Sequence, residues 1–255
     1  MDLRRDALLC AAAALAGAVN SIAGGGTLLS FPAAIAWGLP STVANATNSV
    51  ALMPGSLASA WAYRGEIRAS ATLARWLVPP AVIGSIAGAL LLHVTPVRVF
   101  DALIPWLVLG ATLLILFQGR VPSVPPSVRP TPGTKRRRAL LAVGCQLGVG
   151  VYGGFFGAGM GIVMLAFLTL VVPGDIHHRN GLKNLLAVAI NGVAAIYFVS
   201  AGLVNMRAAA IMTAGAVTGG YVGGQLARRV PGRVVRGIVV SIGLGLSALL
   251  AYRAW

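Results

Sequence analysis

The sequence predicts an all-α integral membrane protein built from two inverted-topology repeats, with re-entrant or broken helices at glycine-rich breaks. Three observations predict this fold class. The composition is strongly apolar, a series of motifs recurs in both halves of the chain, and the basic residues are unevenly distributed among the connecting segments.

The composition excludes an ordinary soluble domain. Of the 255 residues, 57% are hydrophobic and 10% are charged, whereas soluble domains carry about 25% charged residues. Apolar runs near the ~20 residues that cross a bilayer recur along the chain, and residues 185–204 and 237–252 contain no charge. We therefore expect a multi-pass protein of the cell inner membrane.

The net charge of +15 does not indicate a nucleic-acid partner, because the basic residues lie between apolar segments, where they orient membrane helices. Membrane lipid is the expected surrounding. Cys10 and Cys145 lack a CxxC spacing, and His177 and His178 lack further ligands at a suitable spacing. Neither a metal nor a cofactor is expected, and no catalytic motif predicts an enzyme.

Motifs of the first half recur in the second at a nearly constant offset of about 135 residues, which is typical of an internal repeat. The matched pairs are Gly17–Gly26 with Gly150–Gly159, Thr47-Asn48 with Lys183-Asn184, Gly84 and Gly88 with Gly219 and Gly223, and Pro96–Arg98 with Pro231–Arg233. The sequence thus predicts an N-terminal transmembrane repeat over residues 1–118 and a C-terminal one over 139–255. Residues 119–138, rich in proline and arginine, are expected to form an extended cytoplasmic linker.

Each repeat contains five apolar segments. They are residues 7–23, 27–37, 46–63, 71–92 and 98–118 in the first half, and 139–156, 159–172, 183–200, 207–227 and 234–252 in the second. Residues 27–37 would cover only about 16 Å of a ~30 Å hydrocarbon core as a helix. Residues 7–37 and 139–172 therefore form either re-entrant hairpins or pairs of short full spans, and the sequence leaves both open.

The distribution of charge supports an inverted topology. If the first two segments of each half return to the side on which they began, three crossings remain per half, and the halves are inverted. With the linker in the cytoplasm, 15 of the 20 basic residues lie on the cytoplasmic side, as the positive-inside rule requires. Paired inverted halves with interrupted segments are typical of secondary transporters.

Two matched glycine runs are the leading candidates for a substrate site. Gly24, Gly25 and Gly26 precede Thr27, and Gly157 and Gly159 precede Met160. Each run would open the backbone just before a helix whose N-terminal N–H groups and dipole favour an anion. Close helix packing is the alternative, and it is the preferred interpretation for the Gly84/Gly88 and Gly219/Gly223 pairs.

Polar side chains in apolar segments extend this candidate site. Asn20, Thr47, Asn48, Lys183 and Asn184 would be costly in hydrocarbon unless they face a partner or a wet cavity. Lys183 is either a counter-charge for an anion or an interfacial anchor that extends its ammonium group to the membrane surface. The five acidic residues all lie away from the middle of apolar segments, so the sequence shows no buried carboxylate relay.

Several motifs together resemble the TauE/SafE family of membrane transporters, described as sulfite and organosulfonate exporters. They are the stretch Asn20–Pro32, Gly38-Leu39-Pro40, Ala44–Asn48, Pro54-Gly55-Ser56, Tyr63-Arg64, Gly153–Gly159 and Leu182-Lys183-Asn184. The resemblance implies that the glycine regions form a central site for a small sulfur oxyanion or organic sulfonate. It covers nearly the whole chain apart from the linker.

We therefore predict a secondary transporter that exports a small anion, sulfite or an organosulfonate, by alternating access. An anion channel with the same pore groups is one alternative. A membrane scaffold whose Lys135–Arg138 cluster contacts anionic lipid is another. The sequence leaves open the particular anion, the coupling ion, the direction of net transport and the oligomeric state, for which a homodimer is one option.

Overall fold

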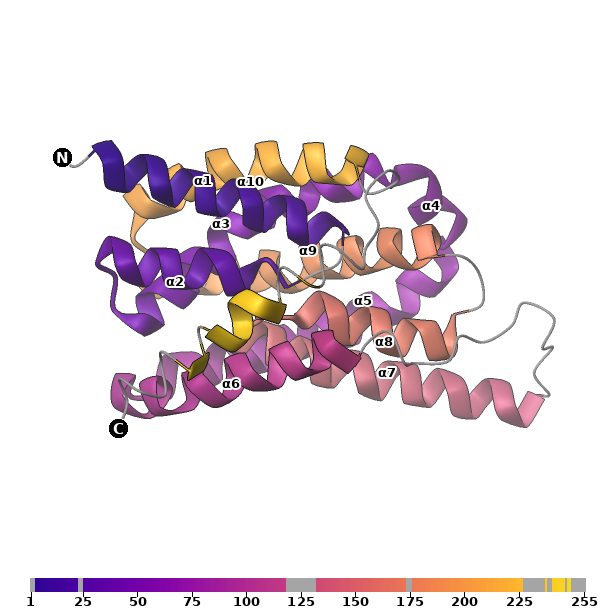
Figure 1. The fold of residues 1–255 in the computed structure, drawn as a ribbon. Coiled ribbons are helices and arrows are strands. Elements are labelled where there is room, and N and C mark those ends of the chain that lie inside the picture. The colour runs from indigo at the N-terminus through magenta and orange to yellow at the C-terminus, as the bar shows by residue number, and fades with distance from the viewer. Residues whose placement is uncertain are drawn as a thin grey trace.

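The computed structural model describes residues 3–22, 25–117, 132–172 and 176–226, together with 237, 240–245, 247 and 248. Within these residues ten labelled helices form a bundle whose members run roughly along one common axis (Figure 1). They are α1 (Leu3–Ile22), α2 (Thr27–Trp37), α3 (Ser41–Ala62), α4 (Arg64–Ala69), α5 (Ala71–Val94), α6 (Val97–Phe117), α7 (Pro132–Phe155), α8 (Met160–Val171), α9 (Ile176–Ser200) and α10 (Met206–Leu226).

The all-helical prediction is confirmed for the described residues, but several boundaries were wrong. α3 begins five residues before the predicted 46, because its small polar residues Ser41 and Asn45 form a buried helical face. α9 likewise begins at Ile176 rather than at 183, and α4 was not predicted. Residues 132–138 of the predicted linker are helical, since Pro132 occupies the first position of α7, where a proline is tolerated. Residues 118–131 and most of the segment 234–252 lie outside the described residues.

The first two helices of each half fold back on themselves. α2 returns to the end of the bundle where α1 begins, since Trp37 Nε1 donates to Asp6 Oδ1 at 2.9 Å. α7 and α8 fold back in the same way (Figure 1). The bends contain Gly25, Gly157 and Gly159, whose φ values of 91°, 72° and 71° fall in the left-handed region that favours glycine.

The long helices pair across the two halves of the chain. α1 packs along α10, and α5 packs along α7 (Figure 1). α3 and α9 contact each other between these pairs. α3 also packs mainly against α10, and α9 packs mainly against α5. Ser59 Oγ donates to the Gly220 carbonyl from α3 to α10, and Ser85 Oγ donates to the Ile190 carbonyl from α5 to α9.

Glycines allow these helices to approach backbone to backbone. A Cβ built on Gly219 of α10 would overlap the carbonyl oxygen of Ala14 in α1, and one built on Gly84 of α5 would overlap that of Leu147 in α7. Between membrane helices no hydrophobic driving force exists, so small residues and close van der Waals contact stabilise the pairs. The structural interpretation of these two glycines is therefore confirmed by their contacts.

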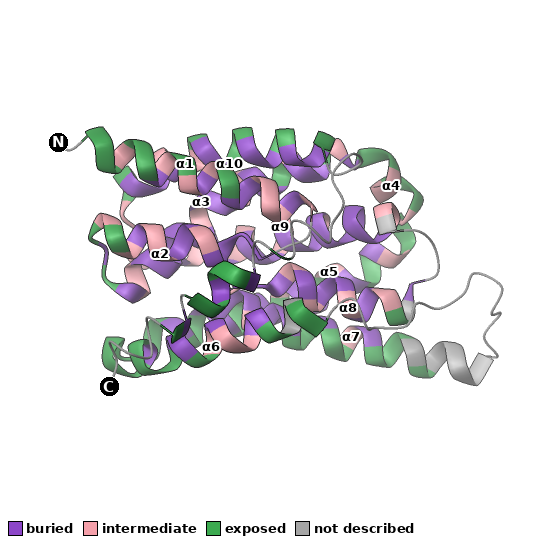
Figure 2. Ribbon diagram, viewed as in Figure 1, coloured by how far each residue is buried: buried purple, intermediate pink, exposed green. Residues whose placement is uncertain are grey.

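The outer surface is apolar, as expected for a chain surrounded by lipid. Large side chains such as Leu8, Ile83, Trp106 and Ile196 are exposed on the helices that form the outside (Figure 2). Three described helices, Leu3–Ile22, Ala71–Val94 and His177–Ser200, are long and apolar enough to cross a membrane. The 11-residue helix α2 covers about 16 Å of a ~30 Å core, so it ends inside the protein rather than crossing alone.

Replacing Gly84 or Gly219 with alanine should destabilise the folded protein, because the new methyl group would overlap the facing carbonyl. Overpacking of this kind costs about 1–3 kcal/mol, against a gain of at most about 1 kcal/mol in helix propensity. The midpoint of thermal unfolding in detergent should fall for both variants. Gly144→Ala is the matched control, since nothing lies within 4 Å of its Cβ position on α7. An equal fall in the control would contradict the packing role.

Candidate functional site

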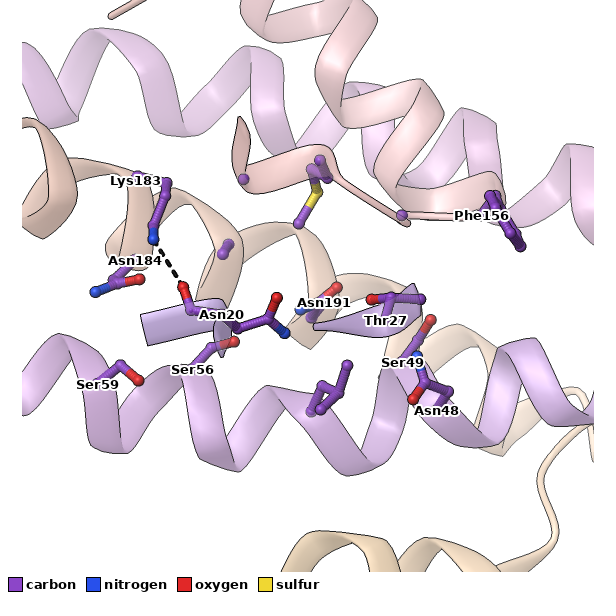
Figure 3. Close-up of a pocket in the computed structure, with 15 residues that line it drawn as sticks. Asn20, Thr27, Asn48, Ser49, Ser56, Ser59, Phe156, Lys183, Asn184 and Asn191 are labelled. Atoms are coloured by element: carbon purple, nitrogen blue, oxygen red, sulfur yellow. Dashed lines mark hydrogen bonds between the residues drawn. The ribbon is translucent and has the colours of Figure 1, made fainter. Parts of the chain in front are cut away.

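A small internal cavity of about 30 Å³ lies between α3 and α9, at the level where both hairpins bend (Figure 3). Its lining is mostly polar. The polar residues are Asn20, Thr27, Asn48, Ser49, Ser56, Ser59, Lys183, Asn184 and Asn191, and the others are Leu52, Phe156, Gly157, Met160, Gly161 and Ala187. The cavity thus collects residues from α1, α2, α3, α8, α9 and the α7–α8 bend, which belong to both halves of the chain.

Lys183 supplies the cation of this cavity. Its side chain is 1% exposed, and its Nζ donates to the backbone carbonyl of Asn20 at 2.7 Å (Figure 3). Asn20 lies in the last turn of α1, where the helix dipole presents partial negative charge that favours a cation. The ammonium group therefore points into the protein, and the alternative of an interfacial anchor does not agree with this geometry.

Asn20 joins the cation to the first glycine break. Its backbone carbonyl accepts from Lys183, while its side-chain Oδ1 accepts from the Gly26 N–H at 2.7 Å. Gly26 is the N-cap of α2, so this N–H is one of the donors that the sequence predicted for an anion. Lys183 Nζ and the Gly26 N–H therefore both donate to oxygen atoms of one residue.

Two asparagines that line the cavity, Asn48 of α3 and Asn184 of α9, each have one unpaired polar atom among the described residues. Asn48 and Asn184 are 2% and 3% exposed, and Asn48 Oδ1 and Asn184 Nδ2 have no hydrogen-bond partner among the described residues. Buried polar atoms normally find a partner, and leaving one unpaired costs stability. The cavity therefore keeps hydrogen-bonding capacity that a polar ligand or water could use.

The second glycine break forms the opposite wall. Gly157, Met160 and Gly161 line the cavity at the start of α8, and Gly159 is the N-cap of that helix. The Met160 N–H donates to the Gly157 carbonyl at 3.1 Å, which closes a tight turn. Phe156 packs edge-on against Phe31 of α2 with ring centroids 5.3 Å apart, so the two breaks touch through an aromatic pair.

Seven of the predicted site residues line the cavity. They are Asn20, Thr27, Asn48, Gly157, Met160, Lys183 and Asn184. Gly25, Gly26 and Gly159 lie in the bends but not in the lining, and Gly24 lies outside the described residues. Thr47 points elsewhere, since its Oγ1 accepts from the Asn205 N–H in the α9–α10 connection.

Sequence reasoning missed the stripe of α3 that lines the cavity. Ser49, Leu52, Ser56 and Ser59 follow one another at intervals of three and four residues, which places them on one helical face. That periodicity was the available signal, because serines on one face of an apolar helix indicate a polar environment. Asn191 of α9 also lines the cavity.

The electrostatics of the cavity favour an anion. None of the described residues that line it is acidic, so a protonated Lys183 has no carboxylate beside it. Among the described residues no group of three or more His, Cys, Asp or Glu could hold a metal ion. The site offers an amine, amides and hydroxyl groups, which are groups able to bind and orient an oxyanion.

The end of the bundle where the chain begins is closed by a polar cluster of Asp6, Trp37 and Arg207. Arg207 donates to Asp6 Oδ2 at 2.6 Å, and its guanidinium lies 5.7 Å from the centre of the Trp37 ring. Trp37 donates to the other carboxylate oxygen of Asp6. The cluster joins α1, α2 and α10 on the side of the cavity away from α4 (Figure 1).

The comparison with known protein families agrees with these features. Residues 9–250 match the family described as sulfite exporter TauE/SafE. The chain belongs to the TauE/SafE family. Members of the TauE/SafE family are membrane transporters rather than enzymes, so the chain is a multi-pass membrane protein of a transporter family.

Individual relatives are similar over almost the full chain. The chain is 30% identical to a probable membrane transporter protein of Haemophilus influenzae over 99% of this chain and 97% of that protein. It is also 30% identical to the probable membrane transporter protein YfcA of Escherichia coli K12, over 94% of this chain and 87% of that protein. It is 28% identical to the probable membrane transporter protein ORF9 of Sinorhizobium sp., over 96% of this chain and 91% of that protein. No solved structure matches the chain.

A cysteine introduced into the cavity should be reachable from water whenever the site opens. With Cys10 and Cys145 replaced by alanine, Ser56→Cys should react with a thiol reagent that carries a sulfonate group. Ser85→Cys is the matched control, because Ser85 is fully buried and bonded to the Ile190 carbonyl away from the cavity. The rate of modification, followed by mass spectrometry, should be much higher for Ser56→Cys. Equal rates would contradict a solvent-accessible site.

Proposed function

We propose that the chain exports a small anion, sulfite or an organosulfonate, across the cell inner membrane by alternating access, with the cavity between α3 and α9 as the substrate site. The observation that carries this proposal is the buried ammonium group of Lys183 in a polar cavity without an acidic lining residue. The substrate class is supported by the description of the family as sulfite exporters.

The arrangement of donors supports an oxyanion. Lys183 Nζ and the Gly26 N–H both bind oxygens of Asn20, which therefore occupies the donors in the empty site. A sulfite or sulfonate group carries three oxygens around one sulfur and could replace both contacts at once. Charge-assisted hydrogen bonds to such oxygens are stronger than those to the neutral amide. Asn184 Nδ2, which has no partner among the described residues, provides a further donor for the same ligand.

The small volume supports alternating access rather than an open pore. A cavity of about 30 Å³ has room for about two water molecules. A four-atom oxyanion needs the surrounding helices to separate, and the Asp6–Trp37–Arg207 cluster closes one end. A narrow site of this kind is expected in a transporter whose helices must move before the substrate can pass. A channel, by contrast, needs a continuous path.

The helix pairing supports two inverted repeats. Gly84 meets the Leu147 carbonyl and Gly88 meets that of Val151, between α5 and α7. In the matching positions of the other half, Gly219 meets the Ala14 carbonyl and Gly223 meets Ala18, between α10 and α1. Each contact in one pair thus has its counterpart in the other, as two structurally equivalent halves would require. Substrate sites of such transporters lie where the repeats meet.

The direct test measures uptake of labelled sulfite, methanesulfonate, sulfoacetate and sulfate into proteoliposomes that contain the purified protein. Saturable flux of sulfite or a sulfonate is expected, since each transport cycle moves a bound anion. Flux that never saturates, together with single-channel current, would favour the channel. Absence of flux for all four anions would overturn the proposed substrate class.

Neutralising the cation should abolish transport without removing the fold. Lys183→Met keeps the length of the side chain but loses a charge-assisted hydrogen bond of about 1.5–3 kcal/mol, or about 10–100-fold in apparent affinity. Asn20→Asp should also stop transport, because a carboxylate beside Lys183 would pair with it and repel an anion. Arg75→Gln removes an exposed cation of α5 and serves as the control. Wild-type flux in both site variants would contradict the proposed site.

A further inference from the structure

We propose that Lys183 carries one proton out of the cell with each exported anion, so that the protein is an anion–proton symporter. This inference rests on the proposed function and adds the coupling ion to it. Lys183 would bind the anion as an ammonium ion and return empty as a neutral amine.

Lys183 is isolated from any counter-charge in the described cavity lining. Lys183 is 1% exposed, and its Nζ donates a hydrogen bond to a neutral group, the Asn20 carbonyl. An ammonium ion removed from water is stable only with a counter-charge or a dense set of acceptors. The described residues that line the cavity include amides and hydroxyls but no carboxylate, and a bound anion would supply the missing charge.

Charged groups on the helices packed against α9 lie away from the cavity. α3 and α8 contain no charged residue. The charges of α1 lie in its first turns, at the opposite end from Asn20. Those of α7 also lie in its first turns, while Tyr152 further along donates its hydroxyl to the Ala158 carbonyl. Arg75 and His93 of α5 are exposed.

The remaining candidates belong to α4 and to α9 itself. Glu66 of α4 lies beside Gly181. Gly181 is two residues before Lys183, so the two positions face directions about 200° apart around α9. Arg64 and Arg68 of α4 are exposed. On α9, Arg179 donates to the Val172 carbonyl at the end of α8, and His177 and His178 lie in the first turn. None of these groups lines the cavity, so none is placed to neutralise Lys183 there.

A transport cycle follows from this charge balance. With the site open to the cytoplasm, the amine of Lys183 takes one proton from water and binds the anion. With the site open to the outside, the anion leaves, and the ammonium ion releases its proton to the water there. The N–H bond formed on one side is broken on the other, and no oxidant or reductant is needed. One proton and one monovalent anion therefore move together, and the cycle transfers no net charge.

The identity of the cation is essential to this scheme. An arginine at position 183 would keep its proton at all accessible pH values. It could bind an anion and exchange it for another of the same kind, but the empty carrier would retain a buried charge and return slowly. Lys183→Arg should therefore separate exchange from net transport, which a purely structural role of Lys183 would not do.

The test uses wild-type protein in proteoliposomes, with methanesulfonate as a probe of constant single charge and sulfite as the second anion. Valinomycin and potassium hold the membrane potential at zero. An acidic outside medium should drive accumulation of the labelled anion, and a protonophore should abolish it. A membrane potential imposed without a pH gradient should not drive methanesulfonate. Flux that follows the potential and ignores the pH gradient would overturn the symport.

Two variants complete the test. Lys183→Arg should lose accumulation driven by the pH gradient while it retains exchange of labelled for unlabelled anion. Glu66→Gln, which changes an acid of α4 outside the cavity, should retain both. Accumulation by Lys183→Arg at the wild-type level would contradict the role of Lys183. If wild-type protein carries none of the four anions, the proposed function itself fails, whereas saturable flux without a proton response refutes only this inference.

Discussion

The structure depends on one constraint: a backbone that is broken inside a membrane must be enclosed by protein. In hydrocarbon no water satisfies the N–H and C=O groups that a helix end leaves unpaired. The α1–α2 and α7–α8 bends both present such groups at the level of the cavity. Close packing of the long helices around them, made possible by glycines at the seams, keeps these bends away from lipid.

The same constraint explains why polar residues concentrate at the centre of an apolar protein. Two asparagines there bond to the backbone at the bends. Asn20 satisfies the N–H of Gly26 and holds the ammonium of Lys183. Asn45 Nδ2 donates to the Phe155 carbonyl at the end of α7, at 2.8 Å. A ligand that entered the site would therefore compete with contacts that hold the bends, and ligand binding and movement of the hairpins would be linked.

Much of this arrangement could be predicted from the sequence. The helix α2 has the bounds predicted for it, and the matched positions Asn48 and Asn184 meet at one cavity. These predictions depended on residue type and spacing, which the membrane constrains strongly. The family and its transporter class also followed from motifs that are specific in combination.

Other features depend on packing that spacing does not reveal. Small residues at four-residue intervals indicate a close contact but not its partner, so the pairing of α1 with α10 could not be predicted. The start of α3 was placed too late, because Ser, Thr and Asn are common in loops, whereas here they form a buried helical face. The two contacts of Asn20 needed coordinates, since they join residues from α1, α2 and α9.

The pairing of α1 with α10 has a consequence for how the protein is made. The ribosome delivers α1 well before α10, whereas among the described helices α5 and α7 are separated by α6 alone. The two seams therefore form at different times. Until α10 is made, α1 lies in the bilayer without its partner helix, with Asn20 at its end. A chain that stops before α10 would leave that helix unpaired and would be a ready target for the proteases that remove incomplete membrane proteins.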